Sequence, residues 1–261
     1  MYSGQEQTPI PKPPAYSPPP QRVKFEDIGE AFQLLQKQLG AWVGAGAITF
    51  FGTLTAVVPF YVWVIASVLR KGENFNPATL LGPILLMALA ILVLSLITTS
   101  GMYQMALKQL RGGRLSTGDL FGNLSKSGPV FVLLVLLGLI GGVIGGISQA
   151  LLGSVLGPFA GLLTSIPSYI LGALSSLSVL LVLDQRLSPI EAIQESWRVM
   201  KSELWTALAF ILVLGMASSL GALACGFGVI FTLPLYYLGM ALMYRNFYPE
   251  RFRVGENTEG L

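Results

Sequence analysis

The chain has 261 residues, of which 53% are hydrophobic and only 11% are charged. A soluble domain carries about 25% charged residues, so this composition excludes an ordinary soluble protein and favours an integral membrane protein. The sequence has no histidine and a single cysteine, which excludes histidine-based metal sites, Ser-His catalytic pairs and an intrachain disulfide. The net charge of +3 is explained by topology and anionic lipid headgroups, so we expect no nucleic-acid partner.

The first 24 residues are polar and rich in proline. They contain no basic segment followed by a short apolar one, so we expect no cleavable signal peptide. A segment of this composition cannot bury a core, and we predict a disordered cytoplasmic tail over 1–24 that acts as a flexible tether.

Four long stretches of the sequence contain no Asp, Glu, Lys or Arg: 41–69, 77–107, 129–183 and 204–244. A membrane-spanning helix needs about 20 such residues. The first two stretches therefore hold one span each, and the last two hold a pair each, with turns at 153–157 and near Gly226. The predicted spans cover 41–69, 78–107, 129–151, 158–183, 204–224 and 227–247, with a short cytoplasmic tail over 249–261.

Amphipathic segments precede each pair of spans, over 25–40, 116–128 and 188–203. The third is the clearest: Ser188, Pro189 and Glu191 form the pattern of a capping box with proline at the first helical position. Apolar residues then recur at spacings of three and four, which predicts a helix lying in the plane of the lipid headgroups.

These segments indicate an internal repeat. Residues 25–39 align without a gap on 190–204, and 116–129 form a weaker copy in which Ser116 and Asp119 take the places of Ser188 and Glu191. Because each unit contains an even number of spans, the three interfacial helices lie on the same side. The predicted fold is an all-α polytopic membrane protein, built from three parallel repeats of an interfacial helix and a transmembrane hairpin.

The orientation follows from the basic residues. Of the sixteen Lys and Arg residues, all but Arg70 and Lys71 fall in segments on one side of the membrane. The positive-inside rule places that side, with both termini, in the cytoplasm. We therefore expect a membrane protein that contacts anionic lipid headgroups on its cytoplasmic side.

Two sets of residues are candidates for interaction. The three interfacial helices form a collar that either only anchors the hairpins or also docks a cytoplasmic partner or anionic lipid; its candidate contact residues are Trp197, Arg198, Lys201, Phe32, Arg111 and Arg114. The second set is Gly138, Gly142 and Gly146, whose four-residue spacing is typical of a close helix-packing face. Hydroxyl residues in the second and fourth spans bond to their own helix or line a cavity for a neutral or lipid-like molecule.

Apart from Arg245 near the end of 227–247, no Asp, Glu, Lys or Arg lies inside the predicted spans, and the sequence has no phosphate-binding loop. Intramembrane acid-base catalysis therefore lacks its groups. We predict no catalytic residue, no cofactor, no metal and no enzymatic activity.

The chain resembles a group of known membrane proteins in three segments, 105–121, 183–205 and 225–245. These are bacterial six-span membrane proteins of unknown function, which are similar to the membrane domain of some glycerophosphodiester phosphodiesterases. The resemblance implies an integral membrane module and supplies no catalytic residue, because no segment can provide the barrel or metal-binding carboxylates of the phosphodiesterase domain. The leading hypothesis is a non-enzymatic scaffold or accessory subunit of the bacterial cytoplasmic membrane, with an interaction surface on its cytoplasmic side. The alternative is a transporter or export component for a neutral, amphipathic or lipid-like solute.

Overall fold

The computed structural model describes residues 22–71, 76–122, 127–156, 160–223 and 227–252, and these ranges are helical with short connections. The α-helices are α1 (Glu26–Lys37), α2 (Leu39–Lys71), α3 (Leu81–Leu110), α4 (Gly128–Leu156), α5 (Ala160–Leu174), α6 (Ser178–Gln185), α7 (Pro189–Met200), α8 (Leu204–Leu223) and α9 (Val229–Phe247). Short 3-10 helices are η2 (Pro77–Leu80), η3 (Thr117–Phe121), η6 (Lys201–Glu203) and η7 (Pro249–Arg251). The predicted tails fall almost wholly outside the described residues.

Five helical stretches are long and apolar enough to cross a membrane: Leu39–Arg70, Ala78–Leu110, Gly128–Leu151, Ser165–Gln185 and Pro189–Gly221. This supports a helical membrane protein. The sixth predicted span, 227–247, is helix α9, but it is not among these five. Its last turn carries Arg245 and Asn246, and most of its second half is buried against protein, so it does not need an apolar surface all round.

Two predicted elements differ in the structure. The span over 158–183 is interrupted, because a turn at 175–177 separates α5 from α6. The interfacial segment over 116–128 is only the five-residue helix η3 in its described part, and 123–126 lie outside the described residues. Of the predicted turn at 153–157, residues up to Leu156 belong to α4; the turn near Gly226 is not described.

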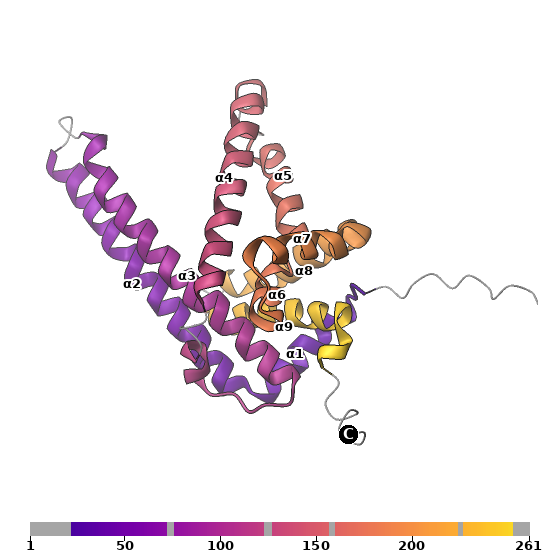
Figure 1. The fold of residues 1–261 in the computed structure, drawn as a ribbon. Coiled ribbons are helices and arrows are strands. Elements are labelled where there is room, and N and C mark those ends of the chain that lie inside the picture. The colour runs from indigo at the N-terminus through magenta and orange to yellow at the C-terminus, as the bar shows by residue number, and fades with distance from the viewer. Residues whose placement is uncertain (1–21, 72–75, 123–126, 157–159, 224–226, 253–261) are drawn as a thin grey trace, which may run out of the picture.

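The hairpins diverge from a common base. In Figure 1 the hairpin α2–α3 leans away from the hairpin α4–α5, and α9 lies below α6 and α7. Helix α8 packs on α9 and α5. Helix α1 packs on α9, η3 packs on α3 and α2, and α7 packs on α6, α5 and α4. We call α1, η3 and α7 the collar. Two glycines permit close approach at this base, since a side chain at Gly46 would clash with the Ile230 carbonyl, and one at Gly101 with that of Leu120.

The buried core lies at the collar end of the hairpins. Its largest fully buried side chains include Trp42, Met102, Met105, Phe210 and Tyr244. The far halves of α2, α3 and α4 instead expose large apolar side chains, among them Leu69, Leu85, Leu86, Leu139 and Leu151. An apolar surface of this extent is typical of contact with lipid.

Candidate functional site: the collar and a basic cleft

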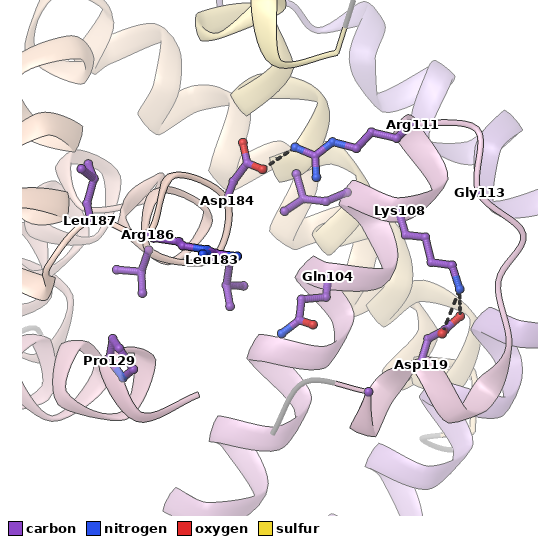
Figure 2. A pocket seen from close by; sticks show the side chains of 13 residues that line it. Gln104, Lys108, Arg111, Gly113, Asp119, Pro129, Leu183, Asp184, Arg186 and Leu187 are labelled. Atoms are coloured by element: carbon purple, nitrogen blue, oxygen red, sulfur yellow. Dashed lines mark hydrogen bonds and ion pairs between the residues drawn. The ribbon is translucent and has the colours of Figure 1, made fainter. Parts of the chain in front are cut away.

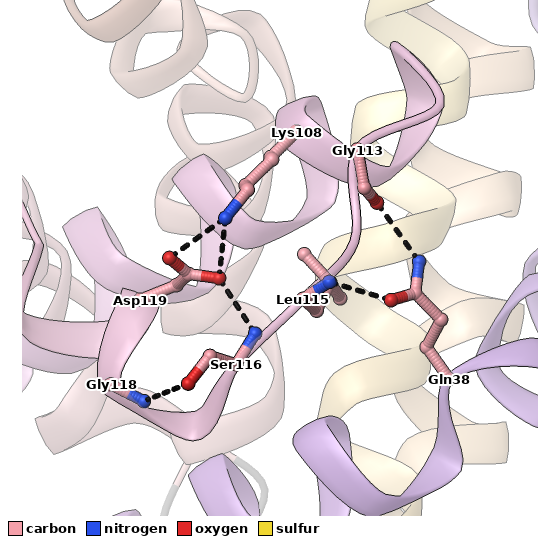
Figure 3. A network of polar contacts seen from close by, with 7 residues as sticks. All are labelled: Gln38, Lys108, Gly113, Leu115, Ser116, Gly118 and Asp119. Carbon is pink, nitrogen blue, oxygen red and sulfur yellow. Dashed lines mark hydrogen bonds and ion pairs between the residues drawn. The ribbon is translucent and has the colours of Figure 1, made fainter.

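Polar contacts tie the collar segments to one another across long distances in the chain. The backbone N–H of Val23, just before α1, donates to Glu203 Oε2 in η6 at 2.9 Å. At the other end of α1, Gln38 Nε2 donates to the Gly113 carbonyl at 3.1 Å, and its Oε1 accepts from the Leu115 N–H at 2.6 Å (Figure 3). Because one side chain holds two backbone groups of the loop before η3, that loop is fixed against α1.

Helix α1 is seated on α9 by charged groups. Arg245 Nη1 and Nη2 donate to the two carboxylate oxygens of Glu30, each at 2.7 Å, a bidentate geometry that is stronger than a single contact. Asn246 Nδ2 donates to Asp27 Oδ2 at 2.7 Å. Burial raises the pKa of Asp27 to about 6, against the opposing effects of Arg245 and Asn246. The hydrogen bonds from Arg245 hold the pKa of Glu30 below its usual value.

Helix α7 is seated differently, on the turn between α5 and α6. Ser196 is fully buried; its Oγ donates to the Leu174 carbonyl at 2.5 Å and accepts from the Leu177 N–H at 3.3 Å. Trp197 Nε1 donates to Ser175 Oγ at 2.9 Å. Ser196 thus bonds two backbone groups at the helix break, which explains how an interrupted fourth span is tolerated in an apolar setting.

The short helix η3 is held by a capping box and an ion pair. Ser116 and Asp119 form the capping box, and Lys108 Nζ donates to both Asp119 carboxylate oxygens, at 2.8 and 2.9 Å (Figure 3). Partial burial acts to raise the pKa of Asp119, but the bonds from Lys108 and the Ser116 N–H outweigh it and lower that pKa. Asp119 is therefore ionised at neutral pH, and its carboxylate is paired with Lys108.

The ends of α3 and α6 are joined by a second ion pair. Arg111 Nη2 pairs with Asp184 Oδ1, and Tyr244 Oη donates to Asp184 Oδ2 at 2.8 Å. The Asp184 side chain is only 5% exposed. Arg111 also lies over the Phe252 ring, with its guanidinium carbon 5.3 Å from the centroid. Arg111 is thus held by an ion pair and by a ring contact.

A cleft of about 840 Å³ opens between the ends of α3 and α6 (Figure 2). Its lining combines apolar side chains, chiefly leucines, with three cationic side chains, two carboxylates and one amide. These are Leu107, Val182, Leu183, Leu187, Pro129, Lys108, Arg111, Arg186, Asp119, Asp184 and Gln104, with Gly113 and Gly122. The volume lies within the range of small-molecule sites.

The predicted contact residues do not form one site. Arg111 lines the cleft, whereas Arg114 is exposed in the loop before η3. Trp197, Arg198 and Lys201 are exposed on α7 and η6, and Phe32 is 52% exposed on α1. Arg198 pairs with Glu195 at 2.6 Å, and its hydrogen bonds lower the pKa of that carboxyl. Apart from Arg111, these side chains lie outside the lining of the cleft.

The glycine face on α4 is open in this chain. A methyl group added at Gly138, Gly142 or Gly146 would meet no atom within 4 Å. These positions therefore make no close contact with another helix of the described chain, and their packing role stays a prediction.

Sequence reasoning missed the cleft. Arg186, Gln104 and Asp184 meet there although α3 and α6 are about seventy residues apart. The available signal was that Asp184 and Arg186 directly follow a long uncharged stretch, but nothing in the pattern identified α3 as the facing wall. Within the described ranges, no group of three or more His, Cys, Asp or Glu residues could hold a metal ion.

Comparison with known proteins finds no matching family model, no matching curated protein and no matching solved structure. The resemblance to the membrane domains of phosphodiesterases therefore stays a prediction.

Proposed function

We propose that this chain is a non-enzymatic scaffold or accessory subunit of the bacterial cytoplasmic membrane. In this proposal α9 is the sixth span, the collar lies on the cytoplasmic face, and both termini are cytoplasmic. Groups on the outer surface of the collar recruit a protein partner.

The packing supports three parallel repeats. Each collar segment contacts the last helix of a neighbouring hairpin: η3 on α3, α7 on α6, and α1 on α9. The last contact joins the two ends of the chain and closes the arrangement. Residues 105–107 near the end of α3 and 240–242 in the second half of α9 both read Met-Ala-Leu, and both are buried, as expected if they occupy corresponding places in two repeats.

One observation carries the scaffold proposal: the collar is fixed internally, yet aromatic and basic side chains remain exposed on its outer surface. Phe32 is 52% exposed and the Arg198 side chain 68% exposed. Aromatic and arginine side chains on a rigid support are the residue types that dominate protein interfaces.

The test is purification of the full chain in mild detergent, followed by quantitative mass spectrometry of the proteins that co-purify with it. The collar variant combines Phe32→Ser, Arg198→Gln and Lys201→Gln. Its matched control combines Leu69→Ser and Arg70→Gln, which change an exposed apolar residue and a cation at the opposite end of α2.

We expect one protein to be recovered in constant ratio with the unaltered chain and with the control. The amount of that protein recovered with the collar variant should be at least tenfold lower, because loss of interface anchors costs about 2 kcal/mol or more. A companion retained equally by all three proteins, or no companion at all, contradicts the scaffold proposal.

The transport alternative rests on a different observation. Ser176 Oγ and Ser178 Oγ, at the break between α5 and α6, are buried without a hydrogen-bond partner among the described residues, as is Ser218 Oγ in α8. Unpaired buried hydroxyls are costly, and contact with the polar group of a neutral, amphipathic or lipid-like solute would satisfy them. If the chain transports such a solute, Ser178→Ala changes flux in reconstituted vesicles at unchanged expression; unchanged flux removes this support.

A further inference from the structure

The lining of the cleft between α3 and α6 combines two kinds of side chain. Leu183 and Leu187 supply an apolar wall, whereas Gln104 and Lys108 from α3 and Arg186 from the end of α6 supply donors (Figure 2). A ligand that matches this lining has an anionic acceptor group beside an apolar portion.

Not all charged side chains of the cleft are paired with an opposite charge. Lys108 is paired with Asp119, and Arg111 with Asp184. Arg186 is exposed and makes no ion pair or hydrogen bond with its side chain among the described residues, so the lining carries one uncompensated positive charge. The Gln104 amide likewise has no partner there, and in Figure 2 it projects into the space between α3 and α6.

The backbone at Arg186 strengthens this observation. Arg186 ends α6 in the left-handed conformation, with φ of 56°, and it is the one non-glycine residue with positive φ in the described ranges. Glycine adopts this conformation freely, whereas a residue with a side chain pays on the order of 1 kcal/mol. An arginine here costs stability that a glycine would not, and a role for its side chain accounts for that.

We propose that this cleft binds the phosphoryl headgroup of an anionic lipid, with Arg186 as its principal contact and Gln104 as a second donor. The planar guanidinium matches the oxygens of a phosphate group in a bidentate geometry, and the leucine wall receives the first carbons of the acyl chains. Lys108 and Arg111 shape the cleft through their own ion pairs. This proposal is independent of any protein partner of the collar.

The experiment measures lipid binding to the full chain in detergent by native mass spectrometry. The probes are a phosphatidylglycerol, the corresponding phosphatidylcholine, and inorganic phosphate as a competitor. The variants are Arg186→Gly, which removes the charge while relieving the backbone strain, and Gln104→Leu. The control is Lys37→Gln, which removes a charge from an exposed collar residue outside the cleft.

We expect one phosphatidylglycerol to bind the unaltered chain at least tenfold more tightly than phosphatidylcholine. Arg186→Gly should weaken that site about tenfold, which corresponds to one lost charge-assisted hydrogen bond, and Gln104→Leu about threefold, while Lys37→Gln leaves it unchanged. Because Arg186→Gly is compatible with the native backbone, its folding is expected to be at least as stable.

Three results would overturn the proposal. Equal loss in Arg186→Gly and Lys37→Gln would mean that only overall surface charge attracts the lipid. An unaltered affinity in Arg186→Gly would remove the assigned contact. Displacement of the lipid by millimolar inorganic phosphate would show that a free phosphate, rather than a lipid headgroup, occupies the cleft.

Discussion

Helices α1 and α7 have closely matching sequence patterns, and the structure seats them by different chemistry. Residues 25–39 and 190–204 share acidic and apolar positions at the same spacing, including Glu30 and Glu195. Glu30 reaches a distant arginine on α9, whereas Glu195 pairs with Arg198 three residues away on its own helix. At the same position of the repeat, Glu30 thus joins the two ends of the chain, whereas Glu195 pairs mainly within α7. Glu195 also accepts a hydrogen bond from Tyr248.

The difference lies in what each helix must cover. Helix α1 meets the polar last turn of α9, where charged groups can be paired, and it carries Asp27 into that contact. Helix α7 meets a break in a hydrophobic span, where backbone groups need partners, and it supplies the hydroxyl of Ser196. A repeated amphipathic pattern therefore fixes the orientation of a helix at the interface, while the partner surface decides which side chain anchors it.

The largest effect is expected from removing the cation that seats α1. In Arg245→Met, the carboxylates of Glu30 and Asp27 lose their counter-charge. The free energy of unfolding should fall by about 2 kcal/mol, between the values for exposed and buried pairs, because the Arg245 and Glu30 side chains are 30% and 40% exposed. Hydrogen exchange should rise in residues 26–37 and stay unchanged in 189–200. Adding Glu30→Gln to Arg245→Met should recover part of the loss; equal exchange in both helices contradicts separate anchoring.

A second effect follows from the buried carboxyl of Asp27. Because burial raises its pKa from 3.8 to about 6, the folded chain binds this proton more tightly than the unfolded chain. Stability from this group is therefore greatest below about pH 4 and declines as the pH rises to about 6.

Asp27→Asn should raise the free energy of unfolding at pH 7 by about 2 kcal/mol and remove this decline. The measurement is thermal unfolding of the variant and of the unaltered chain in detergent between pH 4 and 7, and the quantity compared is the difference between their free energies of unfolding at each pH. Glu30 has a lowered pKa and so contributes stability that is lost on acidification. Because Glu30 is present in both proteins, its contribution cancels in that difference. A pH-independent difference would show that Asp27 titrates normally.

An intermediate effect is expected at the anchor of α7. Ser196→Ala leaves the Leu174 carbonyl and the Leu177 N–H without their partner and should cost about 1.5 kcal/mol. Hydrogen exchange should now rise in residues 189–200 and around 174–178, with 26–37 protected as before. Ser202→Ala is the control, because this exposed hydroxyl bonds only the Val199 carbonyl three residues before it. A comparable loss there would argue against a special role for Ser196.

The smallest effect is expected from the local ion pair on α7. Arg198→Gln removes a pair whose arginine side chain is 68% exposed, so the free energy of unfolding should change by less than about 0.5 kcal/mol. A loss approaching that of Arg245→Met would mean that Glu195 anchors α7 much as Glu30 anchors α1.

The sequence by itself determined the helices and several of their ends. Continuous apolar stretches of about 20 residues or more favour helices in a bilayer, and the structure confirms helices over most of each predicted span. The capping boxes of Ser188 with Glu191 and of Ser116 with Asp119 are confirmed as well, because a cap depends on residues three apart.

Only the tertiary structure decided how these helices are anchored and where a ligand could bind. The break at 175–177 is stabilised by Ser196, some twenty residues away, and α1 is seated by Arg245, more than two hundred residues away. The cleft joins Gln104 to Arg186 across two helices that periodicity treats separately. Hydrophobic pattern and caps are local properties of a chain, whereas charge pairing and cavity shape arise only when distant segments meet.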